Sequence, residues 1–391
     1  MYRKTYVEIN LDNLKSNIKN IKNKYSNYKY YIGMVKSNAY NHGYYIVNSL
    51  MECGINYLAV SSLDEALKIR EYNKNIPVLI TEIIDEDLVN TAIDNNITLT
   101  IDNIDYLKRI GNKKFNVHLK LNTGMNRIGI NSKKEFNEIY EYIKKNNNIR
   151  LEGIYTHFAT PGINDIYYDK QLNKFKEITK DIDLKSIPIV HLSSSFSLIA
   201  HPKIEFENGV RIGTIMYGYD ISLSDYETNI KGKIKKIRDN YLINKNNISP
   251  VIRGVKLNLK PAFKIKTNVM EIRNIKKGEI LGYGTNIVME DMKVAVLPIG
   301  YDSCIGTNTT GRYVLINNKK YSAVGPICMC MMFVKVDDSV KVGDEVTILG
   351  DSLTLGYMSR LNNSHIQETL VNIGKELNKV YIKQGKIDKE L

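Results

Sequence analysis

The sequence contains no tryptophan and only four cysteines among its 391 residues. The thiols, Cys53, Cys304, Cys328 and Cys330, lack the paired spacing with histidine that a metal site needs, so we predict no disulfide framework and no metal. No apolar run reaches the length of about eighteen residues that a membrane-spanning helix requires, and the start leads into an alternating segment rather than a signal-peptide core. These absences favour a soluble, cytoplasmic protein without a membrane partner.

The charge balance is basic, with a formal net charge of +13. Clustered Lys and Arg favour nucleic-acid binding because they release counterions from phosphate backbones, but most of the excess here is scattered. The one dense basic stretch covers residues 231–238, followed by Lys245, within a polar segment at 225–253. No nucleic-acid-reading motif accompanies it, so we favour a solvated surface insertion over a binding tail and expect no nucleic-acid partner.

Between about residues 30 and 220, short apolar runs alternate with segments of helical periodicity. Helices are predicted over residues 11–21, 62–70, 135–145 and 169–179, and Ser62 with Glu65 predicts a capping box. Eight strands are predicted over residues 31–35, 57–60, 77–80, 97–101, 117–121, 151–155, 187–190 and 211–216. Eight strands alternating with helices indicate a (β/α)8 TIM-type barrel of the α/β class, with a doubly wound open sheet as the alternative.

After residue 220 the helical rhythm stops, and short strands return without helices between them. Glycines separate predicted strands at residues 263–272, 294–298, 313–316, 331–336 and 345–349, and a helix is predicted over residues 363–378. A chain of 391 residues is too long for one ordinary compact core. We therefore predict a barrel domain over residues 1–250 and a smaller, mainly β-stranded domain over residues 251–391.

Catalytic groups of a barrel lie at the carboxyl ends of its strands. Each candidate there has an ordinary explanation: a lysine can snorkel to the surface, a histidine can be a satisfied core residue, and a serine can cap a helix. Lys36 stands out because an apolar strand precedes it and a polar turn ending at Gly43 follows it. A desolvated lysine loses its proton readily, and a neutral amine can form a Schiff base with a carbonyl cofactor. The other candidates at strand ends are Arg127, His157, Ser195, Arg211 and Gly213, and the last three lie where barrels bind phosphate.

Nine short motifs are distributed over nearly the whole chain: YVEINLD (6–12), VKSNAYNHG (35–43), TGMNRIG (123–129), YTHFAT (155–160), VRIG (210–213), LKPA (259–262), GYG (282–284), PIGY (298–301) and VGPICM (324–329). Together they resemble the motifs of the alanine racemases, and more broadly of the fold-type III enzymes that depend on pyridoxal phosphate (PLP). A lone match around Lys36 would leave single-domain PLP-binding relatives open, but those lack a β domain carrying Gly282-Tyr283-Gly284.

The resemblance implies that PLP is the cofactor and that Lys36 binds it covalently. Tyr40, Ser195 and the backbone of Gly213 and Thr214 would then hold the phosphate. Arg211 would face the pyridine nitrogen, with His157 linked to it. The cofactor-binding set is thus Lys36, Tyr40, His157, Ser195, Arg211, Gly213 and Thr214.

The substrate-binding set implied by the resemblance is Arg127, Met329 and Tyr301, of which Arg127 and the Met329 backbone N–H would contact the carboxylate. Tyr283 matches the second catalytic base, which in the family reaches the active site of the partner subunit, so a homodimer is expected. Lys36 and Tyr283 would serve opposite faces of the substrate Cα, which is what racemisation requires. Lys120 matches a lysine that is often carbamylated in the family.

Several positions depart from the family pattern. Cys330 stands where Asp is usual, and Gln367 occupies the position of a phosphate-contacting Tyr. An amide in place of a phenol would open the pocket and add hydrogen-bonding groups, which favours a polar amino acid such as serine over alanine. The remaining departures are Asn41 for Gly, Asn122 for Asp, Ser194 for Asn, and a different segment after Tyr301.

Three other classes of protein stay open. A PLP-dependent decarboxylase has a similar two-domain architecture, but its pyridine nitrogen faces a carboxylate rather than an arginine. A degenerate, non-catalytic PLP-binding protein would explain the changes at Cys330 and Gln367, although the retained Lys36, Arg211 and Tyr283 argue against it. A nucleic-acid binder rests on net charge alone.

Overall fold

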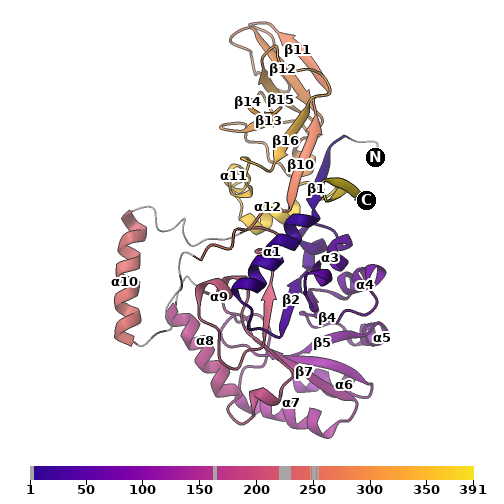
Figure 1. Cartoon of the computed structure of the whole chain (residues 1–391), viewed down its shortest axis with the longest axis vertical. Coiled ribbons are helices and arrows are strands. Elements are labelled where there is room, and N and C mark those ends of the chain that lie inside the picture. The colour runs from indigo at the N-terminus through magenta and orange to yellow at the C-terminus, as the bar shows by residue number, and fades with distance from the viewer. Residues whose placement is uncertain (1–3, 162–164, 220–229, 247, 249–251, 253–254) are drawn as a thin grey trace. The chain divides into compact units, whose positions relative to one another are not determined.

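The computed structural model describes the chain except residues 1–3, 162–164, 220–229, 247, 249–251 and 253–254. The chain divides into two compact units (Figure 1). The barrel unit comprises Lys15–Ala39 and Tyr44–Leu259, and the sheet unit comprises Met1–Leu14, Tyr40–Gly43 and Lys260–Leu391.

The barrel unit contains eight parallel strands in the order β8-β7-β6-β5-β4-β3-β2-β9. All eight strands predicted from the apolar runs are present, with bounds shifted by a few residues. They are β2 (Tyr30–Met34), β3 (Tyr57–Val60), β4 (Val78–Ile80), β5 (Ile97–Ile101), β6 (Phe115–Lys120), β7 (Ile149–Tyr155), β8 (Ile189–His191) and β9 (Gly209–Ile212). A parallel bridge between Ser194 and Arg211 joins the segment after β8 to β9. The first and last strands of the sheet therefore meet, and the sheet forms a nearly closed barrel.

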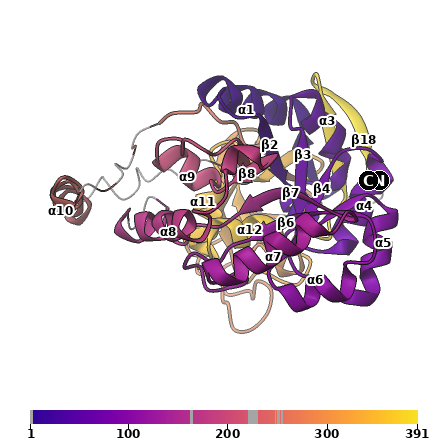
Figure 2. The ribbon, with the colours of Figure 1, turned by 90° about the horizontal axis from the view of Figure 1, so that it is seen from below.

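Helices alternate with these strands and surround them (Figure 2). They are α1 (Leu11–Lys24), α2 (Lys36–Tyr40), α3 (Val47–Glu52), α4 (Leu63–Tyr72), α5 (Val89–Asp94), α6 (Ile104–Ile110), α7 (Lys133–Lys145), α8 (Asp165–Ile178) and α9 (Ser195–Ala200). The (β/α)8-type barrel predicted from the sequence is therefore confirmed, and the doubly wound open sheet is not what forms.

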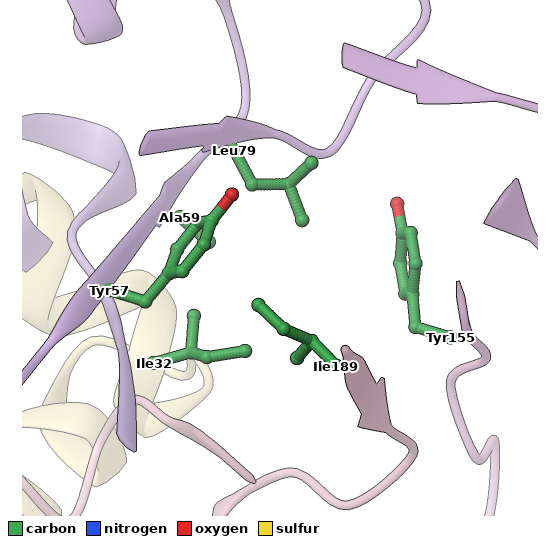
Figure 3. Close-up of a cluster of buried hydrophobic side chains, with 6 residues drawn as sticks. All are labelled: Ile32, Tyr57, Ala59, Leu79, Tyr155 and Ile189. Atoms are coloured by element: carbon green, nitrogen blue, oxygen red, sulfur yellow. The ribbon is translucent and has the colours of Figure 1, made fainter. Parts of the chain in front are cut away.

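The interior of the barrel is filled by side chains, as the continuous apolar runs of its strands require. All five residues of β5 are buried. Figure 3 shows a cluster from β2, β3, β4, β7 and β8 whose side chains converge, namely Ile32, Tyr57, Ala59, Leu79, Tyr155 and Ile189. Two members of this cluster are tyrosines, so polar hydroxyl groups enter the core and must find partners there.

The capping box predicted for α4 forms only in part. The Ser62 side chain accepts a hydrogen bond from the backbone N–H of Glu65, at 3.4 Å. The Glu65 carboxylate does not return to Ser62: it accepts from the backbone N–H of Ser61 at 2.8 Å and from that of Ser37 at 2.5 Å. Glu65 thus connects α4 to the turn that begins at Lys36.

The sheet unit is built on ten strands in the order β11-β12-β15-β14-β13-β16-β10-β1-β17-β18. They are β1 (Tyr6–Asn10), β10 (Phe263–Asn268), β11 (Glu271–Ile275), β12 (Met292–Leu297), β13 (Tyr313–Ile316), β14 (Lys319–Val324), β15 (Met332–Val336), β16 (Glu345–Leu349), β17 (Lys379–Lys383) and β18 (Lys386–Glu390). β1 pairs with β10 and β17, so the N-terminal strand belongs with the C-terminal residues, which a single boundary after residue 250 does not describe.

Two predicted elements of this unit differ from the structure. The strand expected over residues 263–272 is two strands, β10 and β11, because the chain turns at Val269 and Met270. The helix expected over residues 363–378 is the shorter α12 (Ile366–Asn372), preceded by α11 (Leu355–Leu361). Gly374 follows α12 with φ +63°, a conformation that ends a helix and that glycine adopts at low cost.

The basic stretch at residues 231–238 lies on α10 (Ile230–Asn246), and Lys233 and Arg238 are exposed there, as expected for a solvated segment. Residues 225–229 and several between 247 and 254 lie outside the described residues. Within the described part of the chain, no helix has the length and apolar character needed to cross a membrane.

Candidate active site

Lys36 begins α2, two residues after the end of β2, at the carboxyl end of a barrel strand. The five residues from Ser37 to Asn41 all have positive φ, between 51° and 67°, so α2 is a left-handed turn. Left-handed backbone costs about 1–2 kcal/mol for each ordinary residue, so this turn is strained. Strain of this kind persists where surrounding contacts hold it, and it gathers at functional sites.

Arg211 lies in β9 rather than at the start of a strand, and its side chain is buried in the barrel. Both terminal nitrogens of its guanidinium donate to backbone carbonyls: Nη1 to His191 at 2.5 Å, and Nη2 to Thr156 at 2.8 Å and Leu192 at 2.9 Å. Two imidazoles also face it, with Nη1 lying 2.9 Å from His191 Nδ1 and Nη2 3.3 Å from His157 Nδ1. Burial lowers the pKa of Arg211 to about 10, so it remains a cation at neutral pH.

His157 marks the place where the predicted site residues of the barrel unit come together. Burial lowers the pKa of His157 well below its usual value, and the positive charges of four residues lower it further. A coulombic effect falls off with distance, so each of these residues lies within electrostatic reach of the His157 imidazole. The four are Arg211, Lys120, Arg127 and Lys36.

Lys120, the last residue of β6, is buried against Tyr155, with its Nζ 4.4 Å from the ring centroid. Burial, followed by the charges of Arg211 and Arg127, lowers the pKa of Lys120 well below its usual value. A neutral lysine amine is the form that carbamylation requires.

Ser195, Gly213 and Thr214 lie together and are buried, as expected for the ends of the seventh and eighth strands. The Gly213 N–H donates to Ser195 Oγ at 2.9 Å. The loop before Ser195 is held by the buried carboxylate of Glu207, which accepts from the backbone N–H groups of Leu192 and Ser193, at 2.6 and 2.5 Å. These two hydrogen bonds fix the backbone just before Ser195.

The other predicted site residues belong to the sheet unit. Tyr40 ends the left-handed turn, and Tyr283, Tyr301 and Met329 are exposed on this unit. Tyr283 is 72% exposed, which leaves its hydroxyl accessible to another surface.

Cys328 and Cys330 do not lie on a strand. They lie in a turn between β14 and β15, in which the Cys328 N–H donates to the Met331 carbonyl at 2.8 Å. The alternation of side chains along a strand therefore does not apply to this pair.

Two departures from the family pattern have a structural explanation. Asn41, at φ +67°, replaces a glycine in a conformation that asparagine tolerates, and its amide donates to the carbonyl of Ile373 at 2.9 Å. Asn122 accepts hydrogen bonds from the N–H groups of Gly124 and Asn126, so it shapes the loop that carries Arg127.

Three residues in the polar contacts that begin at Arg211 were not predicted as site residues: the buried His118 and His191, and the partly buried Glu152. A signal for His118 exists in the sequence, because it lies two positions before Lys120 on β6, and alternate residues of a strand share a face. For His191 the signal is its place as the last residue of β8, since site residues of a barrel lie at the carboxyl ends of its strands.

Buried neutral histidines predict that the protein loses stability in mild acid. Burial lowers the pKa of His118, His157, His191 and His201 below the unfolded value of 6.5, that of His201 to about 4. As the pH falls below about 6.5, the unfolded chain takes up protons before the folded one, so each histidine can cost up to about 1.4 kcal/mol per pH unit. We expect a lower free energy of unfolding in urea at about pH 5.5 than at about pH 7.5.

The variant His201→Gln provides the control for this prediction. In the native protein the His201 ring stacks on the Tyr168 ring, with 3.7 Å between the ring centroids. The variant should therefore have a lower free energy of unfolding at both pH values, but the difference in that free energy between the two pH values should shrink. The lowered pKa of Lys120 acts in the same direction, whereas the raised pKa of Glu207, caused by burial, opposes it. An unfolding free energy that is equal at the two pH values would contradict the prediction.

Comparison with known proteins agrees with this geometry. Family models described as alanine racemase N-terminal domain and alanine racemase C-terminal domain match residues 9–221 and 262–381. Alanine racemase 1 of Clostridium acetobutylicum is 33% identical over 406 residues, which cover 99% of this chain and 97% of that protein. A solved alanine racemase of Clostridium difficile is 29% identical with a TM-score of 0.85 and covers 100% of this chain and 99% of its own.

A histidine racemase of Leuconostoc mesenteroides, 23% identical with a TM-score of 0.82, covers 98% of this chain and 99% of its own and shares the fold. The alanine racemase N-terminal model alone covers more than half of the residues. The chain therefore belongs to the alanine racemase family and is an amino acid racemase of that kind.

Proposed function

We propose that this protein racemises a small free amino acid with PLP as its cofactor, using Lys36 and Tyr283 as its two acid/base groups. The observation that carries the proposal is that Lys36 follows β2 and that Ser195, which accepts from the Gly213 N–H at 2.9 Å, follows β8, both at carboxyl ends of barrel strands. A primary amine and buried N–H and O–H donors at that end of a barrel are the groups that a phosphorylated carbonyl cofactor requires.

The donor set of the barrel unit fits PLP. Lys36 supplies a primary amine, and Ser195 with the backbone of Gly213 and Thr214 supplies buried donors for a phosphate. Arg211 would meet the pyridine nitrogen as a permanent cation, which disfavours protonation of that nitrogen and limits side reactions. When bound, PLP withdraws electrons from the Cα of an attached amino acid and makes the proton there removable.

Inversion at Cα needs an acid/base group on each face of the substrate. The Lys36 amine removes or returns the proton on one face, and the Tyr283 hydroxyl does so on the other. Arg127 and the Met329 N–H orient the carboxylate, and Tyr301 lies beside the substrate. A phenol acts as a base only where its charged form is favoured, and His157 linked to Arg211 would provide that environment.

A homodimer explains the exposure of Tyr283. Its neighbours in the sequence Ile280, Ile287 and Met289 are 58%, 56% and 76% exposed, an unusual accumulation of large apolar side chains on a surface. A second copy of the chain would bury them and receive Tyr283 in its own barrel. The second base would then come from the partner subunit.

We further propose that the preferred substrate is a polar amino acid such as serine. Gln367 in α12 and Cys330 replace a tyrosine and an aspartate of the family pattern, which changes the size and the hydrogen-bonding groups expected around the substrate side chain. A hydroxyl changes affinity by only about 1–3 kcal/mol unless the pocket is built to hydrogen-bond it. Racemisation rates for L-alanine, L-serine and L-lysine should therefore differ by roughly 10- to 100-fold in favour of L-serine, and a strong preference for L-alanine would contradict this.

One experiment tests the function as a whole. The purified protein should show the visible absorbance of bound PLP, and chiral chromatography should show conversion of an L-amino acid to a mixture of both enantiomers. The same reactions should be assayed for carbon dioxide. Release of carbon dioxide without enantiomer formation would indicate the decarboxylase, and absorbance without either product would indicate a non-catalytic PLP-binding protein.

A further inference from the structure

A row of polar contacts crosses the barrel interior from Arg211 to a carboxylate on β7. Arg211 Nη1 lies 2.9 Å from His191 Nδ1, and His191 Nε2 lies 2.9 Å from His118 Nδ1. His118 Nε2 lies 3.4 Å from Glu152 Oε2. Both imidazoles are fully buried, so each ring nitrogen depends on the protein for its partner.

The contact with Arg211 determines which ring nitrogen of His191 carries the proton. A guanidinium only donates hydrogen bonds, so His191 Nδ1 must accept and carries no proton. A neutral imidazole has its single proton on the other nitrogen, which places it on His191 Nε2. That N–H then donates to His118 Nδ1.

The carboxylate end of the row agrees with this arrangement. Burial alone would raise the pKa of Glu152, but the contact with His118 and the hydrogen bond from Tyr57 lower it to about 2, so the group is ionised and only accepts. Among the described residues, His118 Nε2 makes no hydrogen bond within the usual geometric limits, and Glu152 Oε2 lies 3.4 Å from it. A lone pair there would face an anion, whereas an N–H faces an acceptor, so the proton lies on His118 Nε2.

We infer that Glu152 is a positioning residue for Arg211: it holds His118 and His191 as neutral rings protonated at Nε2, so that the guanidinium always faces an acceptor. Protonating either ring, or moving its proton to Nδ1, would turn an N–H of His191 towards the N–H groups of Arg211. Two buried donors would then face each other, and the guanidinium would have to move.

Two hydroxyl groups hold the Glu152 carboxylate in place by hydrogen bonds. Tyr57 donates to Glu152 Oε2 at 2.6 Å and Thr98 donates to the same oxygen at 3.0 Å. These bonds fix the carboxylate without removing its charge. Other titratable groups also act on Arg211, and none of them is part of the row: Tyr155, Glu207, Arg127 and Lys120.

The native protein provides the first test. Solid-state ¹⁵N NMR of the protein labelled only in its six histidines separates protonated from unprotonated ring nitrogens. His118 and His191 are identified by the contact between their rings. At about pH 7 both should be neutral with the proton on Nε2. A proton on Nδ1 of either ring, or on both nitrogens, would overturn the inference.

A pair of variants separates the charge of Glu152 from its packing. Glu152→Gln removes the charge and can present either an oxygen or an NH₂ group, so the two rings should show mixed protonation, and kcat should fall by about tenfold with KM changed less than about twofold. Tyr57→Phe removes one hydrogen bond but keeps the charge, so both rings should stay protonated at Nε2.

Equal effects of the two variants, or unchanged rings in Glu152→Gln, would overturn the inference. If Glu152→Gln does not fold, the spectrum of the native protein still decides. Since that spectrum requires no turnover, the inference can fail while the proposed racemase activity stands, and the reverse also holds.

Discussion

Lys36→Ala is expected to abolish racemisation, lowering kcat/KM by more than about 10⁴-fold, and to remove the visible absorbance of covalently bound cofactor. The variant loses the two functions proposed for this amine, which are to attach the cofactor and to carry a proton on one face of Cα. The position of the amine at the end of β2, on a strained turn held by Glu65, explains why a neighbouring lysine would not replace it.

Two controls distinguish the amine from its charge. Lys36→Arg keeps the positive charge but has no primary amine, so it should be as inactive as the alanine variant. Methylamine added to Lys36→Ala supplies a primary amine and should restore part of the activity, whereas it should not help Lys36→Arg, whose side chain fills the space. Substantial activity in Lys36→Arg would contradict the role of Lys36.

Local patterns were sufficient to predict the barrel strands. A parallel strand covered on both faces is a continuous apolar run, and such runs are visible without knowledge of the partner strand. β1, β17 and β18 were not predicted, although each has five residues and the predicted β4 and β8 have only three. What stabilises β1 is pairing with β10 and β17, which lie far from it along the chain. No local pattern contains that information.

For the same reason, the sequence pointed to some residues of the candidate site and not to others. Lys36 and Arg211 were proposed because strand ends are recognisable along the chain, and Arg127 was proposed in the loop that follows β6. His118, His191 and Glu152 come from β6, β8 and β7, and each by itself looks like an ordinary strand residue. Their connection to Arg211 exists only once the barrel brings these strands together.

Tyr283→Phe is expected to retain the visible absorbance of bound cofactor while racemisation falls by about 10²- to 10⁴-fold. The ring keeps its shape but has no hydroxyl to carry a proton. In D₂O one enantiomer should still exchange its Cα proton through Lys36 without inverting, whereas the other should not exchange. Tyr241→Phe, which removes the hydroxyl of a tyrosine 63% exposed on α10, should leave activity unchanged. Racemisation at full rate in Tyr283→Phe would exclude the two-base assignment.

Mixing the two inactive variants tests whether Tyr283 acts in the partner subunit. When Lys36→Ala and Tyr283→Phe subunits are unfolded together and refolded with cofactor, about half of the dimers should contain one of each. In such a mixed dimer, the barrel that retains Lys36 receives Tyr283 from the other subunit, so one site is complete and its partner site lacks both groups. About one quarter of the native activity should therefore return. If Tyr283 serves the barrel of its own chain, every site in the mixture lacks one of the two groups and no activity returns.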